Sequence, residues 1–126
     1  MRSGVRQSGT RTAILSGGET RVVLGAGGGR GGRNTEYLAA LALELDGAQG
    51  ISALAADTDG IDGHGDHAGG IVVPELLQLG AKCDLSLAEL LARHDTYSYF
   101  DACGLLLKTG PTRTNVNDFR LILCEA

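Results

Sequence analysis

Glycine constrains this chain more than any other residue type. Twenty of the 126 residues are glycine, and they gather between short apolar runs, most densely over residues 25–32. Glycine loses more backbone entropy on folding than other residues do, so a cluster indicates turns with positive φ or a close approach of the backbone to a ligand. The chain is therefore expected to fold as short helices and strands joined by glycine-rich loops.

The apolar runs predict the regular elements. Two short runs flank Ser16-Gly17-Gly18-Glu19-Thr20 and suggest a β-hairpin. Asn34 is suited to cap a helix, and Ser86 followed by Glu89 is typical of a capping box. The expected strands cover residues 12–15, 21–24, 51–56, 70–73, 105–108 and 120–124, and the expected helices cover 34–46, 74–79, 87–94 and 95–104.

This interleaving of strands and helices predicts the fold class. We expect an α/β protein, a layered α/β sandwich with a mixed, mainly parallel sheet and an N-terminal β-hairpin. Residues 1–11 are expected to form a flexible lead-in, and residues 12–126 a single domain.

Composition and charge narrow the classes of function. The net charge is −4, aromatic residues make up 4% and there is no Trp. Nucleic-acid binding is not expected, because it needs a basic surface and stacking rings. Three cysteines without a CxxC pair predict free thiols in a reducing compartment. The apolar runs are too short to cross a membrane, and the start lacks the apolar core of a signal peptide. We expect a soluble cytoplasmic protein.

Three polar loops each follow an expected strand, over residues 27–36, 57–69 and 109–118. Ligands of open α/β sheets bind where loops leave the carboxyl ends of strands. If these strands run the same way, the three loops gather at one edge of the sheet and form the candidate site.

The first loop has the parts of an anion site. It brings glycine N–H groups, Arg30 and Arg33 to the start of the expected helix, where the dipole favours negative charge. Arg33 is better placed than Arg30 to clamp a phosphate or carboxylate with two hydrogen bonds. The alternative is a solvated arginine beside a flexible loop.

The same glycines allow a rival interpretation. Gly27, Gly29 and Gly32 fit the GxGxxG fingerprint of dinucleotide-binding domains, with Asp57 as the acidic residue at the end of the next strand. That acid lies about 25 residues beyond the last glycine, where about 20 is usual.

The other two loops are rich in oxygen ligands. The second places four carboxylates and two imidazoles within residues 57–67, and repulsion among the carboxylates favours a bound cation. Asp59 and Asp62 are expected to bind a hard metal ion or a hydroxyl group. A zinc site at His64 and His67, or simply a solvated acidic loop, are the alternatives. The third loop is rich in Thr and Asn, which suit a ligand contact and also ordinary turns.

Four motifs, in order, resemble the signature of the MOFRL domain, and the resemblance extends from residue 12 to about residue 124. They are Ser16-Gly17-Gly18-Glu19-Thr20, Gly31-Gly32-Arg33-Asn34-x-Glu36, Thr58-Asp59-Gly60-Ile61-Asp62-Gly63 and Thr109-Gly110-Pro111-Thr112-x-Thr114-Asn115-Val116-Asn117-Asp118. Asp95-Thr96-Tyr97-x-x-Phe100 resembles a further family stretch. This domain is the C-terminal domain of the type II glycerate kinases, which have also been named hydroxypyruvate reductases.

The resemblance implies ATP- and Mg²⁺-dependent phosphorylation of D-glycerate to 2-phosphoglycerate, in a cleft shared with a larger N-terminal kinase domain that this chain lacks. That domain would act in cis or in trans, and the chain alone is expected to be inactive. Arg33 matches the family's active-site arginine, and Asp59 and Asp62 are expected at the magnesium ion. The residues expected to bind substrate or phosphate are Glu19, Gly32, Asn34, Thr58, Asp59, Thr112, Thr114, Asn115 and Asn117.

The chain departs from the family pattern at four positions. Asp57 and Arg113 stand where the family usually has a small residue and a glycine, and His64 and His67 replace more typical residues. Three alternatives to the kinase remain: a non-catalytic anion- or nucleotide-binding module, a fragment of an NAD(P)-linked hydroxypyruvate reductase, and a fragment without function.

Overall fold

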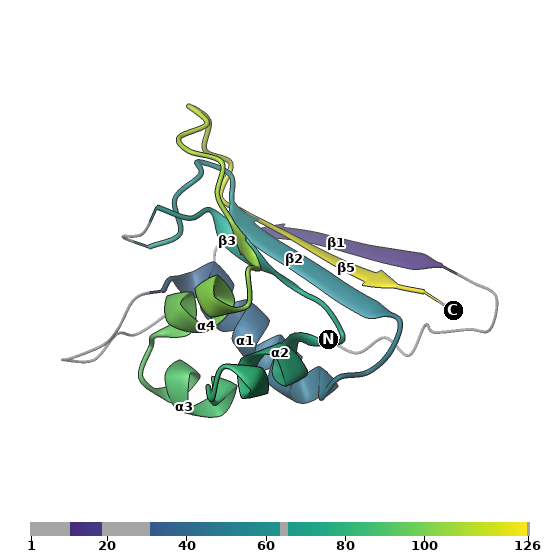
Figure 1. The fold of residues 1–126 in the computed structure, drawn as a ribbon. Helices are drawn as coiled ribbons and strands as arrows, with labels where there is room; N and C mark the ends of the chain where they lie inside the picture. Colours follow the sequence, from purple (N-terminus) through teal and green to yellow (C-terminus); the bar gives the residue numbers. More distant parts are fainter. Residues whose placement is uncertain (1–10, 19–30, 64–65, 126) are drawn as a thin grey trace.

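The computed structural model describes residues 11–18, 31–63 and 66–125. Within these ranges the chain forms five strands and four helices (Figure 1). The strands are β1 (Thr12–Gly18), β2 (Ile51–Asp57), β3 (Gly69–Val72), β4 (Leu106–Leu107) and β5 (Asp118–Cys124). The helices are α1 (Arg33–Leu45), α2 (Leu76–Lys82), α3 (Leu87–Ala92) and α4 (Thr96–Ala102).

The five strands form one sheet in the order β1-β5-β2-β3-β4. Every neighbouring pair of these strands is antiparallel. The predicted mixed, mainly parallel sheet is therefore wrong for the described part of the chain.

The connections explain this difference. A parallel sheet arises when each helix carries the chain across to a neighbouring strand that runs the same way. Here β1 and β2 do run the same way, but β5 comes last in the chain and inserts between them. The described residues between β2 and β3 contain no helix, so the chain turns back beside β2. Strands of alternating direction with all helices on one face are the arrangement of an α+β fold.

The predicted N-terminal hairpin also differs from the structure. Residues 16–18, expected to lie in its turn, continue β1, which pairs with β5 from Thr12↔Cys124 to Gly18↔Asp118. The expected second arm, residues 21–24, lies outside the described residues, as does the lead-in apart from Arg11.

Other local predictions agree more closely with the structure. The N–H of Glu89 donates to the Ser86 hydroxyl over 3.3 Å, which confirms the predicted cap of α3. Helix α1 begins at Arg33 with Gly32 as its N-cap, two residues before the expected cap at Asn34. None of the helices in the described ranges is long and apolar enough to cross a bilayer.

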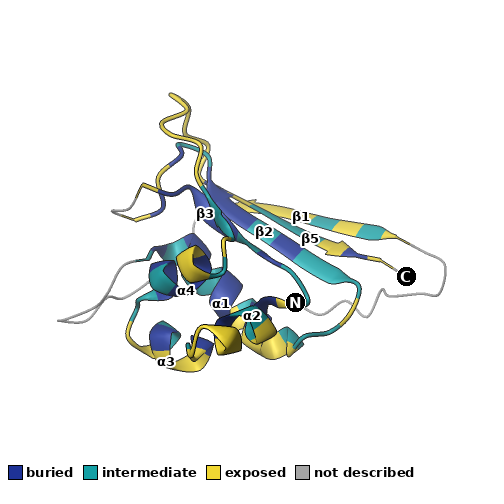
Figure 2. Ribbon diagram, viewed as in Figure 1, coloured by how far each residue is buried: buried dark blue, intermediate teal, exposed yellow. Residues whose placement is uncertain are grey.

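The core lies between the sheet and the four helices, which all cover the same face (Figures 1 and 2). Ala55 and Val72 on the sheet pack with Leu38 of α1 and Phe100 of α4, all at most 2% exposed. The alanines of β2 are small, which lets α1 lie close to the sheet and carries its N-terminus to the sheet edge.

In the described part of the chain no helix covers the opposite face of the sheet (Figure 1). Because side chains alternate along a strand, Leu15, Leu121, Leu54 and Ile71 form one row across β1, β5, β2 and β3 on this face. Leu15 is 64% exposed and Leu123, on the same face of β5, is 42% exposed. We call this surface the outer face.

Candidate anion-binding site

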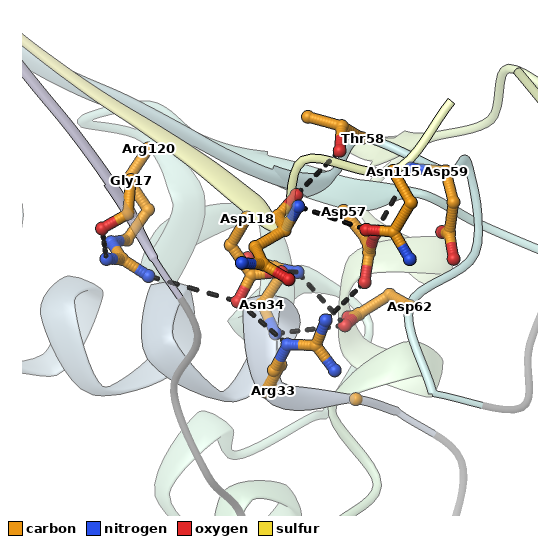
Figure 3. Close-up of polar contacts among 12 residues, drawn as sticks. Gly17, Arg33, Asn34, Asp57, Thr58, Asp59, Asp62, Asn115, Asp118 and Arg120 are labelled. Atoms are coloured by element: carbon orange, nitrogen blue, oxygen red, sulfur yellow. Dashed lines mark hydrogen bonds and ion pairs between the residues drawn. The ribbon is translucent and has the colours of Figure 1, made fainter.

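The described parts of the three polar loops, residues 31–36, 57–63, 66–69 and 109–118, meet at one edge of the sheet. β2 ends at Asp57 opposite the first residue of β5, Asp118, and β3 begins at Gly69 opposite the last residue of β4, Leu107. The second and third loops gather as predicted, because β2 and β4 run the same way although an antiparallel strand separates them. The strand expected before the first loop lies outside the described residues. Helix α1 starts at the same edge, so its first residues face both loops (Figure 3).

Arg33 lies at the centre of this edge and is held by two carboxylates. Its Nε donates to Oδ2 of Asp118 over 2.7 Å, and its Nη2 donates to Oδ2 of Asp57 (Figure 3). The Arg33 side chain is 23% exposed, whereas the side chains of Asp57 and Asp118 are 4% and 0% exposed. The Arg33 side chain is therefore partly exposed while the two carboxylates that hold it are buried.

The surroundings of Asp57 disfavour the ionised form of its carboxyl group. Burial raises the pKa of its carboxyl group, and the charge of Asp59 raises it further. The N–H of Asp59, which donates to Oδ1 of Asp57 over 3.1 Å, and the charge of Arg33 act in the opposite direction without cancelling the rise. Asp57 thus carries its negative charge against the cost of burial.

Asp118 differs from Asp57 because several polar groups surround its carboxylate. Its Oδ1 accepts a hydrogen bond from Nδ2 of Asn34 over 3.1 Å, and its Oδ2 lies 4.0 Å from Nη1 of Arg120 as well as beside Arg33. Arg120 is itself fixed by the hydroxyl of Ser16 and the carbonyl of Gly17. Asp118 therefore links α1, β5 and β1.

Asp62 binds the start of α1. It is fully buried, its Oδ1 accepts from the N–H of Asn34 and its Oδ2 from the N–H of Thr35, each over 3.0 Å. The carboxylate from a distant loop thus satisfies two of the orphan donors of the helix and faces the positive end of its dipole. This contact explains why Asn34 is not the cap, and a Cβ on Gly32 would overlap Asp62.

Charge and hydrogen bonds stabilise the ionised form of Asp62. Burial raises the pKa of this carboxyl, but the side chain of His67 and the N–H groups of Asn34 and Thr35 outweigh burial and lower it. His67 is also fully buried, with its Nε2 3.4 Å from Oδ2 of Asp62 and its ring edge-on to Tyr97.

The third loop is tied to the second by threonine. The Thr58 hydroxyl donates to the carbonyl of Asn117 over 2.7 Å and accepts from the N–H of Val116 over 2.8 Å. The Thr112 hydroxyl donates to the carbonyl of Thr58. Arg113 has φ of 65°, in the left-handed region that favours glycine, which accounts for the glycine usual at this position in the resembling family.

The expected site residues fall into three groups. Gly32, Arg33, Asn34 and Asp62 come together at the start of α1, as described above. The exposed residues of the adjoining wall are Thr112, Thr114, Asn115 and Asn117, beside the half-buried Thr58 and Asp59. Glu19 and His64 lie outside the described residues.

Sequence reasoning missed the two residues that complete this edge. Asp118 closes the fourth motif, and Arg120 follows it by two positions, which places both on the same face of β5. That period of two was the available signal. The sequence pattern indicates Asp57 as an acidic residue at the end of a strand, but it does not indicate the pairing with Arg33. Among the described residues no group of three or more His, Cys, Asp or Glu is placed to hold a metal ion.

Comparison with known proteins finds a matching family. The MOFRL family matches residues 12–118. A protein of Agrobacterium vitis that carries the name of a hydroxypyruvate reductase is 55% identical over 111 residues, which are 87% of this chain and 25% of that protein. The D-glycerate 2-kinase of Thermotoga maritima is 42% identical over 106 residues, 84% of this chain and 25% of the kinase.

Solved structures show the same fold. The crystal structure of the Thermotoga maritima glycerate kinase superposes with a TM-score of 0.85 at 40% identity, over 90% of this chain and 27% of that one. The PH0495 protein of Pyrococcus horikoshii gives a TM-score of 0.86 at 33% identity, over 90% of this chain and 26% of that one. This chain therefore spans about a quarter of the length of these relatives, and it belongs to the MOFRL family.

Proposed function

We propose that this chain is the C-terminal part of a cytoplasmic glycerate 2-kinase of carbohydrate metabolism, which transfers phosphate from ATP to the 2-hydroxyl of D-glycerate. The observation that carries the proposal is the position of Arg33. It lies at the N-terminus of α1, contacts the carboxylates of Asp57 and Asp118, and is partly exposed where the described parts of the three polar loops meet. The relatives named as glycerate kinases support the choice of reaction.

The chemistry of phosphoryl transfer suits this arrangement. Such transfer depends on cations and hydrogen-bond donors placed around the developing charge of the phosphoryl group, more than on a reactive side chain. Arg33 would stabilise the transferring phosphate or hold the carboxylate of glycerate. Thr112, Thr114 and Asn115 would offer hydroxyl and amide groups to substrate or nucleotide from the adjoining wall.

The carboxylates fit a magnesium ion unequally. Both oxygens of Asp62 accept hydrogen bonds from α1, so a metal contact there would compete with the helix. Asp59 is half-buried on the loop and is the better placed ligand. Magnesium commonly binds one or two carboxylates together with substrate phosphates, so ATP and the larger domain would complete its shell. The ion would supply positive charge to the phosphate oxygens.

We propose that a larger N-terminal domain completes the enzyme, in cis or in trans. The support is twofold: the chain spans about a quarter of its relatives' length, and the outer face exposes apolar side chains such as Leu15 and Leu123. Without that domain the chain would lack one wall of the cleft, and we expect no kinase activity.

The reductase alternative has less structural support. A dinucleotide fold would place the phosphate loop between neighbouring parallel strands and use an acid such as Asp57 for the ribose. In the described residues neighbouring strands are antiparallel, and Asp57 is paired with Arg33. A non-catalytic anion-binding module would use the same Arg33 contacts but would not respond to the larger domain.

A chimera tests the proposal. This chain would replace the matching quarter of the Thermotoga maritima D-glycerate 2-kinase, and two activities would be assayed. We expect glycerate-dependent consumption of ATP that is lost in Arg33→Ala and retained in Arg93→Ala, an exposed arginine of the same chain. Oxidation of NADH by hydroxypyruvate in place of kinase activity would instead support the reductase. Activity that survives Arg33→Ala would remove Arg33 from the catalytic role.

A further inference from the structure

The two carboxylates on Arg33 are not equivalent. Asp118 has further partners in Asn34 and Arg120. The cation beside Asp57 is Arg33, and its carboxylate neighbour Asp59 adds repulsion. Asp118 would therefore keep its surroundings if Arg33 turned to an external anion, whereas Asp57 would lose its counter-charge.

The geometry also places Asp57 on donors that an anion needs. A phosphate or carboxylate binds arginine most strongly through two parallel N–H donors of the guanidinium fork. Nε and Nη2 form one such pair, and here Asp118 and Asp57 accept from them. An anion that accepts this hydrogen bond from Nη2 would have to occupy the position of the Asp57 carboxylate.

We propose that Asp57 is an internal counter-ion of Arg33 that limits affinity, so that an external anion binds there by displacing the Asp57 carboxylate. Asp118 acts as the positioning residue and keeps its contact with Nε. This inference rests on the proposed anion binding by Arg33. It concerns Asp57, the position at which the MOFRL family usually has a small residue.

The test measures binding of inorganic phosphate to the full chain by calorimetry at pH 8. Asp57→Asn removes the charge but keeps the shape of the side chain and an oxygen that can accept from the N–H of Asp59. We expect it to tighten phosphate binding about tenfold, because the competing charge lies in contact with a partly buried guanidinium. Asp118→Asn removes the same charge from the same guanidinium and is the matched control. It should not tighten binding, because it loosens Nε of Arg33.

The outcomes separate this inference from the proposed function. Unchanged or weaker binding in Asp57→Asn, together with lost binding in Arg33→Ala, would overturn the counter-ion role and leave the anion site in place. Equal tightening in Asp57→Asn and Asp118→Asn would also overturn it, since the effect would then come from net charge alone. Phosphate binding that is indifferent to Arg33→Ala would remove the anion site and the inference together.

A second variant protects the test from a folding artefact. Circular dichroism would establish that each variant is folded before titration. If Asp57→Asn does not fold, Asp57→Ser replaces it with the same expected tightening. The Nε–Hε resonance of Arg33, observed by NMR, should also shift on addition of phosphate at a lower concentration in the Asp57 variant than in the unmodified chain. An equal phosphate dependence in the two proteins would contradict displacement.

Discussion

Nε of Arg33 lies 2.7 Å from Oδ2 of Asp118, although 85 residues separate the two along the chain. This contact joins the first turn of α1 to the first residue of β5, and it places the proposed catalytic arginine at the sheet edge. The side chain of Asp118 is fully buried. We therefore expect the Asp118 carboxylate to affect both the stability of the fold and the proposed function.

Replacing Asp118 with alanine should destabilise the fold. The change removes the acceptor shared by Arg33 and the amide of Asn34, and the carboxylate that lies 4.0 Å from Nη1 of Arg120. We expect a loss of about 2–3 kcal/mol in the free energy of unfolding, reduced from the fully buried case because Arg33 is partly exposed. Urea denaturation measures it. Arg93→Ala breaks the exposed Arg93–Glu89 pair and should cost at most about 0.5 kcal/mol. Equal losses in the two variants would contradict a structural role for Asp118.

Gly32→Ala should weaken the start of α1. Gly32 has an extended backbone with φ of −177°, so the cost is steric and comes from overlap with Asp62. The matched control is Gly104→Ala, where nothing lies within 4 Å of the new Cβ but φ is +73°. The control should cost about 1 kcal/mol, and Gly32→Ala more than that. Thermal unfolding of both variants compares the two costs, and a smaller loss at Gly32 would show that Asp62 moves away freely.

The Asp62 carboxylate should make stability depend on acid pH. Its pKa in the folded chain is lowered from the ordinary value of 3.8, so the ionised form stabilises the fold fully above that value. This contribution is lost as the pH falls below 3.8 through the folded pKa. Asp62→Asn should therefore be less stable than the unmodified chain at neutral pH, by about 1–3 kcal/mol, and the difference should shrink in acid.

Urea unfolding over a series of pH values checks this expectation. Asp101→Asn, which removes an exposed carboxylate from α4, serves as the control for the loss of one charge. A stability difference between Asp62→Asn and the unmodified chain that stays constant down to acid pH would show that the helix contact does not depend on ionisation.

Charged substitutions on the outer face should have little effect on folding but should prevent assembly with the proposed larger domain. Leu15 and Leu123 are 64% and 42% exposed, so Leu15→Glu combined with Leu123→Lys should change the free energy of unfolding by no more than about 1 kcal/mol. If the larger domain covers this face, the same double variant should fail to gain kinase activity when that domain is supplied in trans. Activity equal to that of the unmodified chain would place the domain contact elsewhere.

Much of the candidate site was predictable from sequence because its parts are local. Each polar loop lies beside a recognisable apolar run: this holds for the glycines beside Arg33, for the acidic loop and for the Thr- and Asn-rich loop. Four ordered motifs also indicated the family, which the comparison confirms. The cap of α3 by Ser86 was likewise predictable, since the bond spans only three residues.

The pairing of strands, and of side chains far apart in the sequence, could be identified only from the tertiary structure. Local patterns describe which residues form a strand but carry no information about which strand will lie beside it, so the insertion of β5 between β1 and β2 was not foreseen. The same limit applies to the cap of α1, where Asp62 arrives from a loop 28 residues beyond Asn34. Glycine spacing and motif order thus determined the loops and their chemistry. Long-range packing decided that Asp57 and Asp118 share one arginine, because burial and charge pairing act between residues that only the tertiary fold brings into contact.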